Sequence, residues 1–109
     1  MDDAHFFWEM FIKNESDYRD FRASPMKAAS HEGLPATFIA SAECDPIRDA
    51  VEAYGPVLEK AGVEVEMKRY PGMVHGFVSW LGFLPGAQAA MADACAFAKK
   101  QFAAARQDA

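Results

Sequence analysis

The stretch ATFIASAECDPIRD, residues 36–49, decides the fold class of this chain. Its first half belongs to a short, nearly unbroken apolar run, Pro35–Cys44, which turn residues flank on both sides. That pattern is typical of a strand buried on both faces of a parallel sheet. Its second half predicts the start of a helix, because Asp45 is a good N-cap and Pro46 is a good first helical residue. The stretch therefore predicts a buried strand that leads directly into a helix.

The predicted helix has a regular apolar face. Its apolar residues recur at steps of four and three, at Ile47, Val51, Tyr54, Leu58 and Ala61. Gly62 predicts the end of the helix, in the C′ position that favours glycine. Gly55-Pro56 interrupts the middle of the pattern, where a proline can kink a helix.

A second strand is indicated over Val63–Tyr70, where apolar residues alternate with charged ones. Such alternation predicts an edge strand with one face in water, and Pro71-Gly72 predicts its end. The order strand, helix, strand predicts two parallel strands joined by a right-handed crossover. A strand buried on both faces needs more neighbours than one such pair supplies, so the chain encodes too few strands for a free-standing sheet.

The remaining segments predict two flanking helices and their connections. An aromatic-rich helix is expected over Asp2–Lys13, where packing is favoured over a role as the wall of a small-molecule pocket. Asn14–Glu32 is polar and predicts an extended connection with at most one short turn. Met73–Phe77 predicts a loop, and Leu84–Gly86 a further break. Ala87–Ala105 predicts a helix whose packed face carries Met91, Ala94, Cys95, Ala98 and Phe102.

Length and composition narrow the class of protein. The 109 residues fit one domain or part of one, and the apolar share of 51% excludes intrinsic disorder. A net charge of -5 argues against a nucleic-acid partner, and no apolar stretch is long enough to span a bilayer. The acidic start predicts no signal peptide, so a cytoplasmic location is expected. Cys44 and Cys95 are expected to be buried free thiols.

Two residues of the predicted strand–helix–strand unit have side chains suited to acid–base catalysis. Asp45 follows the first strand and His75 follows the second, 30 residues later. Parallel strands bring their carboxyl ends to one edge of the sheet, which is where open α/β sheets bind ligands. A carboxylate that accepts from an imidazole N–H leaves the other ring nitrogen free to act as a base. The same residues also have simpler interpretations. Asp45 could serve only to cap the helix, and His75 could be a loop histidine with no functional role.

The motifs resemble a known family. Leu34-Pro35-Ala36, the segment 42–49, Ala61-Gly62-Val63 and the segment 69–77 are similar to the C-terminal third of hormone-sensitive-lipase-like esterases, in the α/β-hydrolase superfamily; Phe7-Trp8 and Ala23-Ser24-Pro25 also match. The resemblance implies a partial α/β-hydrolase fold over residues 1–109. Residues 1–34 would form a helix and connection, and residues 35–109 a strand, helix, strand, loop and helix.

The resemblance also implies site residues. Asp45 would be the acid of a catalytic triad and His75 its general base, acting on a small-molecule ester in the complete enzyme, with no metal or organic cofactor. The family's Gly-x-Ser-x-Gly nucleophile motif and its His-Gly-Gly-Gly oxyanion motif are absent from this sequence. None of the serines has the glycine framing, and Cys44 has no oxyanion site beside it; the serines are Ser16, Ser24, Ser30, Ser41 and Ser79. The 109-residue chain alone is therefore expected to be inactive.

Three interpretations stay open at this point. The chain is the C-terminal part of an esterase whose missing N-terminal part covers the sheet, or a non-catalytic α/β module whose exposed sheet edge pairs with another copy. A third keeps the superfamily and assigns the chain to a dienelactone-hydrolase-like or serine-peptidase-like C-terminus. Under the first, the aromatic residues Phe77, Trp80 and Phe83 lie either beside the substrate pocket or in the core.

Overall fold

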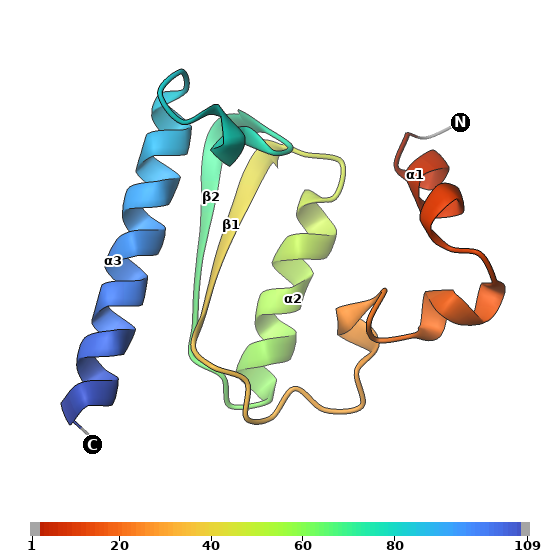
Figure 1. The fold of residues 1–109 in the computed structure, drawn as a ribbon, viewed down its shortest axis with the longest axis horizontal. Helices are drawn as coiled ribbons and strands as arrows, with labels where there is room; N and C mark the ends of the chain where they lie inside the picture. Colours follow the sequence, from red (N-terminus) through yellow and green to blue (C-terminus); the bar gives the residue numbers. More distant parts are fainter. Residues whose placement is uncertain (1–2, 108–109) are drawn as a thin grey trace.

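The computed structural model describes residues 3–107, and their elements follow the predicted α/β order. Two parallel strands, β1 (Thr37–Cys44) and β2 (Val65–Val74), form the sheet. The helix α2 (Arg48–Lys60) connects them, and α3 (Pro85–Gln107) covers the opposite face of the sheet (Figure 1). The shorter elements are α1 (Asp3–Phe11), η1 (Glu15–Arg19), η2 (Pro25–Lys27) and η3 (Phe77–Trp80). This architecture confirms the predicted strand, helix, strand unit with its two parallel strands and its flanking helices.

The strand β1 is buried on both faces, as its apolar run predicted. On one face Ile39 packs with Leu58 of α2. On the other face Ala42 packs with Tyr70 of β2 and with Ala87 of α3. Leu58 is 1% exposed, and full burial of a leucine side chain contributes about 1.5–3 kcal/mol. The two helices therefore hold the sheet through two separate apolar clusters.

The helix α2 begins two residues later than predicted, at Arg48 instead of Pro46. Asp45 is not its N-cap, because residues 45–48 form a turn in which Arg48 N–H donates to the carbonyl of Asp45 at 3.1 Å. The Asp45 carboxylate stabilises this turn by accepting from Ile47 N–H at 2.9 Å. At its other end the helix stops as predicted, with Gly62 at a φ of +81°. It runs through Pro56 as one helix.

The strand β2 continues past Pro71-Gly72 to Val74, so the prediction that it ends there is wrong. Ala42 pairs with Tyr70, whereas Cys44 pairs with Val74, so β2 carries a bulge between these two pairs. Gly72 adopts a φ of +69° within it, a conformation that favours glycine. The predicted loop at residues 73–77 is thereby reduced to a turn at residues 75 and 76, before η3.

The charged side of β2 is exposed to solvent, as expected, and it also contacts α3. Lys68 Nζ contacts the Asp93 carboxylate at 2.6 Å, and the Tyr70 hydroxyl donates to Asp93 at 2.7 Å. Nearer the other end of the strand, Lys100 Nζ contacts Glu64 at 2.9 Å. Charged residues of the alternating pattern therefore form ion pairs with side chains of α3.

The packed face of α3 differs from the predicted one. Ala87, Ala90 and Phe97 are buried, whereas Met91, Cys95 and Phe102 of the predicted face are exposed. The small side chains of Ala87 and Ala90 let this part of the helix lie close to the sheet, and Phe97 packs on Phe38 of β1 further along. Cys44 is exposed too, so the expectation of buried thiols is wrong for both cysteines. The predicted break at Leu84–Gly86 already contains the first helical residue, Pro85.

The N-terminal arm is more ordered than the predicted extended connection. It forms two 3₁₀ helices, η1 and η2, because Asn14 and Asp17 make a capping box at the first and Pro25 starts the second. The predicted helix α1 packs on this arm through Trp8, whose ring centroid lies 5.9 Å from that of Tyr18. Figure 1 shows α1 and η1 lying beyond α2, away from the sheet.

The chain is wider and more exposed than a compact domain. Its radius of gyration is 16.1 Å, against about 13 Å for a compact domain of the same length. It exposes 8063 Å², against about 6,000 Å² for a folded monomer of its mass. Large apolar side chains contribute to this excess, among them Phe83 and Phe102, which are 82% and 71% exposed. Extensive apolar surface is thus left uncovered by the chain itself.

Candidate active site

The two strands deliver Asp45 and His75 to one edge of the sheet. Cys44 and Val74 are opposite each other in the ladder, so the next residue on each strand is Asp45 and His75. Gly76 follows at a φ of +71°, which turns the chain away from the sheet directly after the histidine. This edge, where both strands end, lies at the top of Figure 1.

The side chains of the two residues meet. Nδ1 of His75 lies 2.9 Å from Oδ2 of Asp45, within hydrogen-bond distance. The Asp45 side chain is 10% exposed, whereas the His75 side chain is 67% exposed. Oδ1 of Asp45 is held separately by Ile47 N–H. The carboxylate is therefore held within the protein, and the imidazole extends from it into solvent.

This geometry determines which imidazole nitrogen can act as a base. An ionised carboxylate can only accept a hydrogen bond, so Nδ1 of the neutral ring carries the proton. Nε2 then holds a lone pair, and the Asp45 carboxylate stabilises the imidazolium that forms when Nε2 takes up a proton. Within residues 3–107, no serine or cysteine side chain is hydrogen-bonded to Nε2 of His75.

Glu43 and Arg48 support this edge and were not singled out from the sequence. The Glu43 carboxylate accepts from Gly72 N–H at 2.7 Å, across the bulge of β2. Arg48 donates through Nη1 to the backbone carbonyl of Glu43 at 2.8 Å and is also paired with Asp49. The signal in the sequence is a carboxylate two residues before Asp45, on the strand that lies beside the Pro71-Gly72 bulge.

The other candidates of the sequence analysis lie apart from this pair. Phe77 is in the core, with its ring centroid 5.4 Å from that of Tyr70, whereas Trp80 and Phe83 are exposed at the surface. Ser41 is buried within β1, where its hydroxyl donates to Glu52 of α2 at 2.7 Å. The aromatic residues thus divide between the core and the surface, with Phe77 alone of the three buried.

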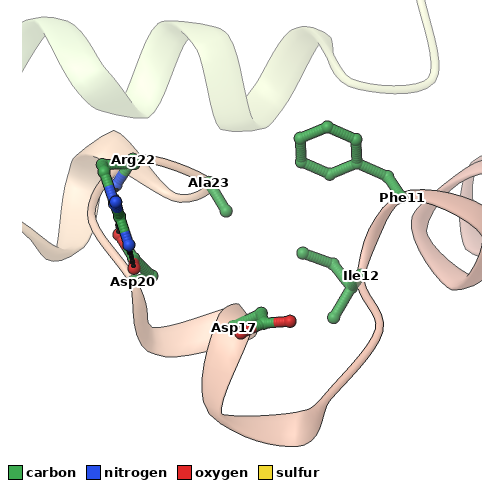
Figure 2. A pocket seen from close by; sticks show the side chains of 6 residues that line it. All are labelled: Phe11, Ile12, Asp17, Asp20, Arg22 and Ala23. Carbon is green, nitrogen blue, oxygen red and sulfur yellow. Dashed lines mark hydrogen bonds and ion pairs between the residues drawn. The ribbon is translucent and has the colours of Figure 1, made fainter.

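A cavity of about 230 Å³ lies elsewhere, in the N-terminal arm (Figure 2). Its lining residues are Phe11, Ile12, Asp17, Asp20, Arg22 and Ala23, so the aromatic helix α1 does contribute a wall. Its charged groups are already paired, since Arg22 Nη2 contacts the Asp20 carboxylate at 2.6 Å. Hydrogen bonds from Arg22 lower the pKa of Asp20 to about 2. The cavity shares no lining residue with the Asp45–His75 pair.

Residues 3–107 contain no group of three or more His, Cys, Asp or Glu side chains placed to hold a metal ion. In the same range, no helix combines the length and the apolar character needed to cross a membrane.

A family model described as the alpha/beta hydrolase fold matches residues 1–79. The chain belongs to this α/β-hydrolase family. Within it, the relatives place the chain among the hormone-sensitive-lipase-like esterases, as the motifs predicted. Carboxylesterase NlhH of Mycobacterium tuberculosis is 46% identical over 59 residues, which are 54% of this chain and 18% of NlhH.

Solved α/β hydrolases share the fold as well as the sequence pattern. The ester-hydrolase EH1AB1, from the metagenome of Lake Arreo, is 35% identical with a TM-score of 0.81, over 93% of this chain and 33% of that one. A Pyrobaculum calidifontis esterase is 30% identical with a TM-score of 0.78, over 88% of this chain and 32% of that one. This α/β-hydrolase chain thus spans about a third of these solved structures, and 18% of NlhH.

Proposed function

We propose that this chain is the C-terminal portion of a carboxylic ester hydrolase and supplies two members of its catalytic triad. Asp45 is the acid and His75 the general base, whereas the nucleophile and the oxyanion hole come from hydrolase sequence outside these 109 residues. The observation that carries the proposal is the 2.9 Å contact of His75 Nδ1 with Asp45 at the strand ends, with the imidazole extending outward. The esterase names of the relatives support the reaction class.

The proposed reaction divides into acylation and deacylation. His75 Nε2 takes the proton of a serine hydroxyl as the oxygen attacks the carbonyl carbon of the ester. The tetrahedral intermediate collapses, the ester C–O bond breaks, and the imidazolium returns the proton to the leaving alcohol. Water then attacks the acyl-enzyme with the same base assistance and releases the carboxylic acid. Asp45 keeps Nδ1 protonated and stabilises the imidazolium at each step.

The uncovered surface of the chain supports the same assignment. β1 pairs with β2 along one edge only within the described residues, and its buried position needs a further neighbour. In this proposal the rest of a hydrolase domain covers that edge, rather than a second copy of the chain. The esterase relatives favour this over the self-associating module and over the dienelactone-hydrolase-like or peptidase-like alternatives.

The isolated chain gives the first test. With p-nitrophenyl acetate or butyrate as substrate, the 109-residue chain should show no turnover above buffer, because the nucleophile is outside it. Turnover that disappears in a His75→Ala variant would contradict this part of the proposal.

A chimera gives the second test. The last third of the Lake Arreo ester-hydrolase is replaced by this chain, and hydrolysis of p-nitrophenyl butyrate is measured. His75→Ala should lower kcat/KM by about 10³-fold or more, as losses of a triad member do. Ser79→Ala, four residues further on, is the matched control and should leave the rate within about twofold. A folded, active chimera that is indifferent to His75→Ala would overturn the proposal.

A further inference from the structure

The parallel ladder changes register just before the site. Ala42 is opposite Tyr70, whereas Cys44, two residues later on β1, is opposite Val74, four residues later on β2. The bulge therefore inserts two extra residues into β2. Without them Asp45 would lie opposite Met73 instead of His75. Because the insertion is even, it preserves the alternation of side chains between the two faces.

The bulge removes regular partners from the backbone at this point. Pro71 has no N–H to donate, and Gly72 has the left-handed φ of +69°, which takes it out of the ladder. The Gly72 N–H donates instead to the Glu43 carboxylate, with Oε2 at 2.7 Å. A hydrogen bond to an ionised acceptor is among the stronger ones available to a backbone amide. The side chain of Glu43 thus replaces a strand partner for the bulge.

Glu43 is itself held in place from the other side. Arg48 donates to its backbone carbonyl at 2.8 Å, from the first turn of α2. Asp45, two residues after Glu43, is fixed by the turn that leads into the same helix. One short segment therefore carries both the acid of the pair and the group that fixes the strand bearing the histidine.

We propose that Glu43 is a positioning residue for the Asp45–His75 pair: by accepting from Gly72 N–H, its carboxylate holds the two-residue bulge that brings His75 opposite Asp45. The use of the pair in ester hydrolysis rests on the proposed function, whereas the positioning itself does not. Glu43 touches neither reacting side chain, so its effect passes through the backbone of β2.

The test separates reach from charge at position 43. Glu43→Asp keeps the charge but is one methylene too short to reach Gly72, whereas Glu43→Gln keeps the reach and an acceptor oxygen but loses the charge. Glu59→Asp, the same shortening on the exposed face of α2, is the matched control. NMR of the ¹⁵N-labelled 109-residue chain reports Gly72 amide exchange and the His75 Nδ1–H resonance. Urea midpoints report overall stability.

In Glu43→Asp the Gly72 amide should exchange about tenfold faster, the effect expected for one lost hydrogen bond. The His75 Nδ1–H resonance should weaken through exchange with water. Glu43→Gln and Glu59→Asp should retain both signals. Unchanged signals in Glu43→Asp would overturn the proposal, as would equal losses in Glu43→Gln or Glu59→Asp. No part of this test uses hydrolysis, so an active chimera that is indifferent to His75→Ala would contradict the proposed function without affecting this result.

Discussion

At the scale of single residues, Asp45 divides its two carboxylate oxygens between two tasks. Oδ1 accepts from Ile47 N–H and shapes the turn into α2, and Oδ2 faces Nδ1 of His75. Because both oxygens must accept, an ionised carboxylate satisfies the site in full. An amide of the same shape cannot, since one of its ends can only donate.

An Asp45→Asn variant should therefore reverse the tautomer of His75. The Asn oxygen is required by Ile47 N–H, so the amide NH₂ points at Nδ1 and donates to it. The imidazole proton then moves to Nε2, which can no longer act as a base. Imidazole ¹⁵N shifts of the 109-residue chain at neutral pH measure the tautomer, with Asp49→Asn as the control. If Nδ1 stays protonated in Asp45→Asn, the assigned orientation of the carboxylate is wrong.

At the scale of elements, features that follow from the strand–helix–strand order were predictable, and features set by individual side-chain contacts between elements were not. The apolar run of β1 and the spacing of Asp45 and His75 led to a correct strand and a correct meeting of two side chains. Pro71-Gly72 suggested the end of β2. The sequence does not reveal that the Gly72 N–H has an acceptor, because that acceptor is the Glu43 carboxylate on the other strand. The N-cap and the turn at Asp45 favour the same residue types, so the sequence could not distinguish them.

The helix α3 illustrates the same limit. It carries two apolar stripes of equal periodicity, one with Ala87, Ala90 and Phe97 and one with Met91 and Phe102. Only the sheet selects between them, because the smaller side chains allow the closer approach. Its N-terminal end is closest of all: a Cβ built at Gly86 would overlap the side chain of Met73, next to the β2 bulge.

Gly86→Ala should consequently stabilise the chain by less than the roughly 1 kcal/mol that helix propensity offers, because the Met73 side chain must shift to admit the new Cβ. In a Met73→Ala background the overlap is removed, and the same Gly86→Ala change should stabilise by up to about 1 kcal/mol through helix propensity. Urea unfolding of the four chains of this double-mutant cycle measures the difference between the two backgrounds. Equal effects in both backgrounds would mean that α3 does not contact Met73 as described.

At the scale of the whole molecule, carboxylates tie the layers together. Glu52 on α2 accepts hydrogen bonds from Arg69 and Ser41 of the sheet, which lower the pKa of its carboxyl to about 2. On the other face, hydrogen bonds from Lys68 and Tyr70 lower the pKa of Asp93. Each carboxylate joins a helix to the sheet in its ionised form.

These shifts predict acid sensitivity. A carboxyl whose pKa is lowered by folding stabilises the native state above its unfolded pKa of about 4.3, and this contribution fades as the pH falls toward 2. The urea midpoint should therefore fall between pH 5 and pH 2. Glu52→Gln should be less stable at pH 7 and should show a shallower fall. A wild-type midpoint that rises with acid would contradict the assigned ion pairs.

The bulge in β2 has a consequence for how such a molecule changes over time. On the N-terminal side of the bulge, apolar packing against the helices sets the strand register. On its C-terminal side, Glu43 and the turn at Asp45 set it. The stability of the fold and the geometry of the Asp45–His75 pair therefore depend on separate sets of residues on the same two strands. Substitutions in the packed half can therefore leave the geometry of Asp45 and His75 unchanged.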